Sequence, residues 1–144
     1  MSMVHDNIIK SYSVDFDTKT LVIKTVYTNA NVTEKADIIF TDYLAHNFDN
    51  VMKGSMIFDI YEYCPDILLK HDDKMLKESK NHGWPFGYES DDDFKSFIQT
   101  HGYKIFEVFS SIGLSGVIFA KQMTIVVNGV AVGCQGDNDG IDTM

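Results

Sequence analysis

Apolar and polar residues alternate along much of the N-terminal half of the chain, which is the period of a half-buried β-strand. The alternation is clear over residues 10–16, and β-branched and aromatic residues resume over 20–27 after the polar break 17–19. These two runs predict an antiparallel hairpin. Further strands are predicted over 36–40 and 55–63.

The segments between these strands carry weaker signals. Residues 28–34 are rich in Asn and Thr and predict a polar loop. Residues 41–48 fit either a helical turn or a continuation of the preceding strand, and we expect an extended segment with an irregular end.

A change of period after residue 63 predicts two helices. Pro65 suits the first turn of a helix over 66–82, with Leu68 and Leu76 on its apolar side and Gly83 as its stop. The second helix, over 90–101, has stronger end signals: Ser90 is a typical N-cap, Asp93 completes an acidic capping box, and Gly102 favours the C-terminal turn.

Two more strands are predicted over 103–111 and 116–128, joined by residues 112–115. The sequence therefore predicts an α+β domain with a mainly antiparallel sheet of about six strands and two helices inserted before the last hairpin. We expect one domain over 1–128. Residues 129–144 are rich in Gly and Asp and predict a flexible C-terminal tail.

The apolar members of these strand and helix stripes form the expected core. They are Phe16, Leu21, Ile23, Phe40, Phe58, Ile60, Phe94, Ile98, Ile105, Phe119 and Met123.

Charge narrows the choice of partners. The chain has 12 basic and 21 acidic side chains, for a net charge of −9, and every basic residue is a lysine. Nucleic acid is therefore a disfavoured partner, since its recognition relies on basic surfaces and guanidinium groups. A basic protein is the favoured partner.

The N-terminus has neither the basic nor the apolar region of a signal peptide, and no apolar run is long enough to span a membrane. We therefore expect a cytoplasmic protein that does not bind membranes. Its two cysteines are too few for a disulfide framework.

One candidate group for chemistry combines Asp42, His46 and Asp49. Their spacing of four and three would place them on one face of a helix, where a histidine and two carboxylates could exchange protons or hold a metal weakly. The simpler interpretation is that the two aspartates are loop or cap residues and that His46 is half-buried beside aromatic neighbours.

A second candidate group lies on the strand over 55–63. Alternation places Asp59, Tyr61 and Tyr63 on one face of this strand and Ile60 and Glu62 on the other. Tyrosines beside carboxylates could line a ligand pocket, form a binding surface for a partner, or simply be a solvated edge.

No motif requires a metal or cofactor. The acidic run 91–93 fits the first turn of a helix better than a metal site, and the segment 135–140 lacks the spacing of a calcium loop. No nucleophile elbow, zinc motif or phosphate-binding loop occurs. We expect neither metal nor cofactor, and an enzyme is the less favoured interpretation.

The segments IIFTDYLAHNF (38–48) and MIFDIYE (56–62), followed by GLSG (113–116), resemble small uncharacterised proteins of low-GC Gram-positive bacteria. Some of these look like immunity proteins encoded beside polymorphic toxins. The resemblance implies a cytoplasmic, non-enzymatic protein that binds and blocks a toxin domain.

The leading hypothesis is therefore an acidic binding protein of the immunity type. Its candidate binding residues are Asp59, Tyr61, Glu62, Tyr63, Asp42, His46 and Asp49, and we expect the acids among them to steer a basic partner. The alternative is a protein that binds a small apolar ligand in a pocket between a curved sheet and the helices.

Overall fold

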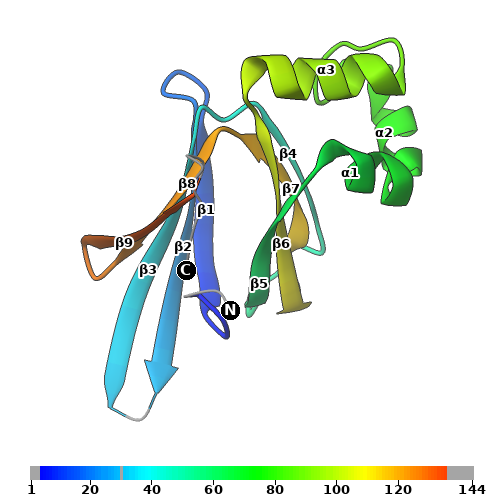
Figure 1. The fold of residues 1–144 in the computed structure, drawn as a ribbon. Coiled ribbons are helices and arrows are strands. Elements are labelled where there is room, and N and C mark those ends of the chain that lie inside the picture. The colour runs from blue at the N-terminus through cyan, green and yellow to red at the C-terminus, as the bar shows by residue number, and fades with distance from the viewer. Residues whose placement is uncertain (1–3, 30, 136–144) are drawn as a thin grey trace.

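The computed structural model describes residues 4–29 and 31–135, with the side chains of 133–135 left aside. Within these residues the chain forms one mainly antiparallel sheet with helices packed on it (Figure 1), so the predicted α+β class is confirmed. The predicted element count is wrong, because the described residues form nine strands and three helices rather than about six strands and two helices.

Strands occupy both ends of the chain, and the three helices lie together between the fifth and sixth strands. In chain order the elements are β1 (Ile8–Asp15), β2 (Thr20–Asn29), β3 (Val32–Thr41), β4 (Ala45–Asp49), β5 (Met56–Tyr63), α1 (Pro65–His71), α2 (Asp73–Lys80), α3 (Asp91–His101), β6 (Lys104–Ile112), β7 (Ser115–Ala120), β8 (Gln122–Val127) and β9 (Val130–Gln135).

The strand order β4-β7-β6-β5-β1-β2-β3-β8-β9 describes a sheet that folds over on itself. Figure 1 shows two halves, with β1, β2, β3, β8 and β9 on one side and β4, β7, β6 and β5 on the other. Buried side chains from both halves form one hydrophobic cluster between them, and the rings of Phe40 on β3 and Phe106 on β6 lie 5.3 Å apart. The sheet therefore encloses its own core, as antiparallel sheets do when they pack face to face.

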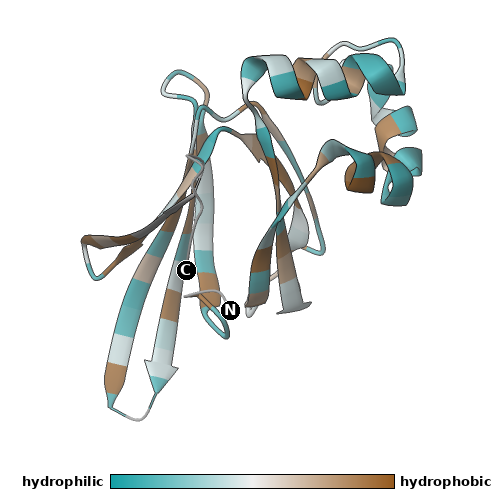
Figure 2. Cartoon of the chain, in the orientation of Figure 1, coloured by the Kyte–Doolittle hydropathy of each residue, from teal (hydrophilic) through white to brown (hydrophobic). Residues whose placement is uncertain are grey.

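A second cluster lies between the helices and the outer face of the β4-β7-β6-β5 half. Phe94 and Ile98 of α3 pack there with Leu68 of α1 against Ile105 and Phe119 of the sheet. The helices cover only one end of this outer face, and the ends of β5 and β6 farthest from them stay uncovered (Figure 1). Figure 2 shows the matching alternation of hydrophobic and hydrophilic bands along the strands.

The additional strands arise where the chain turns a corner. The predicted strand over 116–128 is interrupted at Lys121, whose main-chain N–H donates to the Thr41 carbonyl at 3.0 Å. On either side of Lys121, β7 pairs with β4 and β6, and β8 pairs with β3 and β9. One run of apolar residues thus supplies a strand to each half of the sheet.

The chain also continues in the sheet beyond residue 128, where we expected the tail to begin. Asn128 and Gly129 both have positive φ, at 49° and 85°, and connect β8 to β9. Positive φ at both central residues is typical of the tight hairpin turns that Asn-Gly sequences favour. The rest of the predicted tail, 136–144, lies outside the described residues.

The predicted loop at 28–34 is also shorter than expected. Strands β2 and β3 pair in register as far as Asn29 and Val32, so most of the predicted loop belongs to the two strands. The ambiguous stretch 41–48 contains β4, in agreement with the extended segment we expected.

The predicted helix over 66–82 is divided at Asp72, which has φ −122° and ψ 30°. Aspartate is a poor residue for a helix interior and a good one for a first turn, so the Asp72-Asp73 pair favours ending one helix and beginning the next. The N-cap and the C-terminal turn predicted for α3 are confirmed: the Ser90 hydroxyl accepts the Asp93 N–H at 3.2 Å, and Gly102 has φ 74°. The Asp93 carboxylate accepts the N–H of Glu89 at 3.2 Å rather than that of Ser90, so the predicted capping box is not formed.

Two predicted core residues are exposed. Phe16 is 77% exposed because the Asp15 carboxylate accepts the N–H groups of residues 17 and 18 and ends β1 before it. Phe58 is 42% exposed because the register between β5 and β6 shifts on both sides of Ile57, which turns Phe58 away from the core. Ile60 is only partly buried, although it packs against the core between the two halves.

Candidate functional site

The candidate residues fall into two separate groups, because β7 and β6 lie between β4 and β5 in the sheet. Asp42, His46 and Asp49 belong to the β4 region, and Asp59, Tyr61, Glu62 and Tyr63 belong to β5. The seven residues therefore do not form one site.

In the β4 region the two aspartates lie away from His46. Asp42 occupies an exposed turn with φ 53°, before β4 begins. His46 pairs with Ile118 and faces the core between the halves, whereas Asp49 pairs with Ser115 and points to the opposite face. The spacing that would align these side chains on a helix therefore separates them in a strand.

His46 lies instead in a cluster of rings formed with Tyr12, Tyr43 and Phe48. Its Nδ1 shares a 2.6 Å hydrogen bond with the Tyr43 hydroxyl, and the Phe48 ring lies 4.8 Å away. Burial lowers the pKa of His46 and raises the pKa of Tyr43. The half-buried, structural role considered for His46 matches this environment.

Strand β5 has the two faces that its alternation predicts. Asp59, Tyr61 and Tyr63 pair with Phe109, Glu107 and Ile105 of β6 on the outer face. Ile60 and Glu62 lie on the other face, where Glu62 forms an ion pair with Lys104 at 3.4 Å.

The uncovered end of this outer face carries three exposed aromatic rings. Phe58, Tyr61 and Phe109 are 42%, 37% and 46% exposed. The Phe109 ring lies 5.7 Å from Phe58 and 6.4 Å from Tyr61, so the three form one continuous patch. We call Phe58, Asp59, Tyr61, Glu107 and Phe109 the β5–β6 surface.

Sequence reasoning missed Phe58, Glu107 and Phe109 as site residues. The alternation of apolar and polar residues over 55–63 predicts a buried Phe58, because nothing in this alternation indicates the bulge. Phe109 and Glu107 had a usable signal, since both alternate with the buried Phe106 and Val108 and so belong to the opposite face. The strand pairing that brings them beside Asp59 and Tyr61 could not be derived from the pattern.

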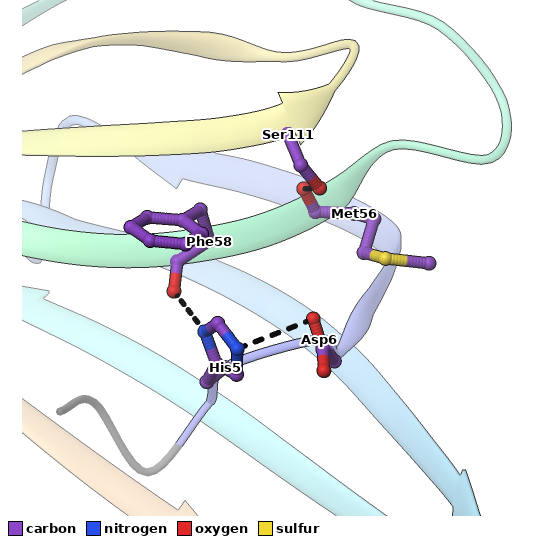
Figure 3. A network of polar contacts seen from close by, with 5 residues as sticks. All are labelled: His5, Asp6, Met56, Phe58 and Ser111. Carbon is purple, nitrogen blue, oxygen red and sulfur yellow. Dashed lines mark hydrogen bonds and ion pairs between the residues drawn. The ribbon is translucent and has the colours of Figure 1, made fainter.

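The N-terminal segment supports the bulge at Phe58 (Figure 3). His5 Nδ1 donates to the Phe58 carbonyl at 2.6 Å, and its Nε2 lies 3.5 Å from the Asp6 carboxylate. The Phe58 ring packs edge-on against the His5 ring at 5.1 Å. Main-chain bonds from Asp6 and Ile9 to β5 and its preceding residue fix the segment further. These contacts with the N-terminal segment therefore hold the exposed Phe58 in place.

Two carboxylates lie among the rings of this surface. Asp59 accepts the N–H of Ile60 at 2.8 Å through one oxygen, and Glu107 accepts the hydroxyl of Tyr63 through one of its own. Burial, with this bond to Glu107, raises the pKa of Tyr63. In the part of the chain that the structure describes, neither carboxylate forms an ion pair.

The space between the sheet and the helices, where the alternative hypothesis places a pocket, is packed with the side chains of the second cluster. A groove of about 770 Å³ lies elsewhere, along α3, with Tyr88, Phe97 and His101 among its lining residues. It is an open hollow, lined also by charged residues such as Lys80 and Glu89.

Residues 4–29 and 31–135 contain neither a metal-binding cluster nor a membrane-spanning helix. These residues hold no cluster of three or more histidine, cysteine or acidic side chains placed to bind a metal ion. Their helices are too short or too polar to cross a membrane.

Comparison with known proteins adds no assignment to this geometry. No protein-family model, characterised protein or solved structure matches the chain.

Proposed function

We propose that this chain is a non-enzymatic, acidic protein-binding module that docks its partner on the β5–β6 surface. The observation that carries the proposal is the patch of three exposed rings, in which Phe109 lies beside both Phe58 and Tyr61, on a sheet face that the helices leave uncovered. Grouped exposed apolar side chains are typical of interaction sites, and aromatic residues are enriched at the centres of protein interfaces.

Charge favours a basic partner. The chain carries a net charge of −9 and no arginine, and the rings are interleaved with the carboxylates of Asp59 and Glu107. Such a field accelerates association with a positively charged protein and disfavours an acidic one. Asp42, Asp49 and Glu62 lie off this surface and add to the general field.

A toxin domain neutralised in the cytoplasm is the partner that best fits this proposal. The resemblance of 38–48 and 56–62 to immunity-like proteins supports it, and so does the acidic charge, because nucleases and other basic toxins offer the complementary surface. In this role the protein blocks a toxin by covering its active surface and needs no catalytic residue of its own.

Capture from native lysate with matched variants tests the docking surface. Phe58→Thr with Phe109→Thr removes two rings of the surface, and Val130→Thr with Val132→Thr removes two exposed apolar residues on β9. We expect the wild-type chain and the β9 variant to retain the same basic protein and the surface variant to lose it. Equal retention by all three would overturn the proposal.

Binding kinetics of the captured protein at two ionic strengths test the role of charge. Asp59→Asn with Glu107→Gln should slow association and flatten its salt dependence, whereas Tyr61→Ala should mainly raise the dissociation rate. An association rate that does not change with salt would contradict electrostatic steering. A toxin-like reading frame beside the gene would identify the partner to test first.

The groove along α3 supports a second candidate, the binding of a small ligand. Phe97 and His101 stack with centroids 4.1 Å apart and line the groove together with Tyr88. The aromatic lining suits an apolar part of a ligand, and the charged rim suits polar substituents. Phe97→Ala would abolish such binding while leaving capture through the β5–β6 surface unchanged.

A further inference from the structure

The pairing of β5 with β6 arranges four side chains of the β5–β6 surface as a checkerboard. Asp59 lies opposite Phe109, and Tyr61 lies opposite Glu107, all on the outer face. The two carboxylates therefore occupy one diagonal and the two rings the other. Side chains at directly opposed and diagonal positions of an antiparallel pair are close enough to act on one group together.

The rings are half-exposed and inclined to one another. The centroids of Tyr61 and Phe109 are 6.4 Å apart at 39°, and Phe58 extends the apolar area on the far side of Phe109. Aromatic faces attract cations through their quadrupole. An apolar partner side chain would satisfy the rings but would leave two carboxylates to be desolvated beside it, which is unfavourable.

The carboxylates are available to a cation from outside the chain. Asp59 and Glu107 each use one oxygen for a hydrogen bond within the sheet, and no lysine pairs with either one in the described residues. Lys104 of β6 lies on the other face of the sheet, where it is paired with Glu62.

Among cations, a guanidinium group matches this arrangement better than an ammonium group. It is planar and can lie against a ring while its edge donates hydrogen bonds to carboxylates, and it is more weakly hydrated. A lysine ammonium is a compact, strongly hydrated charge that cannot do both as well. A second copy of this chain is excluded as the donor, because the sequence contains no arginine.

From this juxtaposition we propose that Asp59, Tyr61, Glu107 and Phe109 form a binding site for an arginine side chain of a basic protein partner. The inference rests on the proposed function, since it specifies what the partner presents to the β5–β6 surface. The arginine lays its guanidinium against the exposed rings of Tyr61 and Phe109 and pairs with the two carboxylates, and Phe58 packs against its methylene groups.

Two short peptides that differ only in their cation test the site. Each is an acetylated and amidated Gly/Ser hexapeptide with two basic residues, arginine in one and lysine in the other. Titration at low salt, followed by the backbone amide NMR signals of the intact chain, should shift the signals of 58–61 and 107–109. We expect the arginine peptide to bind at least threefold more tightly than the lysine peptide.

Variants that preserve shape then separate the two contributions. Phe109→Leu keeps an apolar side chain but removes the ring, and it should reduce the arginine preference to less than twofold; Tyr61→Leu provides the same test at the second ring. Glu107→Gln should weaken both peptides, whereas Glu34→Gln, a control on β3, should weaken neither. Undisturbed amide spectra away from the site establish that each variant is folded.

The outcomes distinguish this inference from the proposed function. Equal affinity for the two peptides, or an arginine preference that survives Phe109→Leu and Tyr61→Leu, overturns the arginine site. If captured basic protein still depends on Phe58 and Phe109, the docking function stands without it. If the shifted amides lie elsewhere and capture is also indifferent to those rings, both proposals fail.

Discussion

His46 illustrates how a single half-buried side chain can link stability to pH. Its ring lies among Tyr12, Tyr43 and Phe48, and burial lowers its pKa below the ordinary value of 6.5. The unfolded chain therefore binds this proton more readily than the folded chain does. The stability that depends on neutral His46 is complete above pH 6.5 and decreases as the pH falls from there toward the lowered pKa.

We therefore expect His46→Gln, which keeps a polar group near Tyr43, to flatten the dependence of unfolding free energy on pH between about pH 5 and pH 7. Urea titrations at three pH values measure this slope. His82→Gln, at an exposed position after α2, is the control and should leave the slope as it is. An unchanged slope in the His46 variant would refute the assignment.

Phe106 and Phe58 should contribute differently to stability. Phe106 is fully buried against Phe40, whereas Phe58 is 42% exposed at the bulge of β5. Phe106→Ala should cost about 3–5 kcal/mol through lost burial and a cavity. Phe58→Ala should cost about 1 kcal/mol, because its ring remains partly in water in the folded state. Denaturant titration of both variants checks the order, and equal losses would contradict it.

At the scale of elements, the ends of α3 were easier to predict than the ends of the strands. The caps of α3 follow from local chemistry, because Ser90 and Gly102 each act within one turn of their own position. The break at Asp72 and the bulge at Phe58 depend on what each element packs against, which no local pattern contains. Lys121 ends a strand for the same reason, since its neighbours pair with different halves of the sheet.

The hairpin of β8 and β9 was predictable in principle, because Asn128-Gly129 is a strong turn signal between β-branched residues. The Gly- and Asp-rich composition of 129–144 predicts a flexible tail instead, and that prediction took precedence over the turn signal. Asn128 also anchors the turn to β3, since its main chain and its side chain both bond with the main chain of Lys35.

This turn gives a prediction with a matched control. Gly129 has φ 85°, where an L side chain is strained, although nothing lies within 4 Å of an added Cβ. Gly129→Ala should therefore lower the unfolding free energy by about 1–2 kcal/mol. Gly87→Ala meets equally open space without the positive φ and should be neutral or slightly stabilising. Equal effects of the two substitutions in urea titrations would exclude a strained turn.

At the scale of the whole molecule, the sequence predicted the class of fold but not the way the sheet folds over. Alternation indicates that one face of each strand is buried, and it leaves open which strands meet across the core. The candidate site shows the same limit: Asp59 and Tyr61 were placed on one face from their spacing, whereas Glu107 and Phe109 join them only through the pairing of β5 with β6. Distant strands meet through tertiary structure, which the local period does not encode.

The net charge of −9 also acts on the whole molecule, because compaction brings like charges together. The ion pairs that oppose this repulsion in the described residues include exposed ones such as Lys77 with Asp73 and Lys24 with Asp37, which contribute little. Added salt therefore weakens the repulsion among the acidic side chains more than it weakens the attraction within the ion pairs. Raising sodium chloride from about 10 mM to about 150 mM shortens the screening length from roughly 30 Å to roughly 8 Å.

We accordingly expect the urea midpoint of unfolding to rise over this range of salt, with an unchanged dependence on urea concentration. Urea is the suitable denaturant because guanidinium chloride is itself a salt. Potassium chloride should give the same rise if screening is the cause, whereas a rise with sodium alone would indicate binding of that ion. A midpoint that falls with both salts would mean that attractive ion pairs dominate the folded state. The net charge of −9 would then no longer support the proposal of a basic partner.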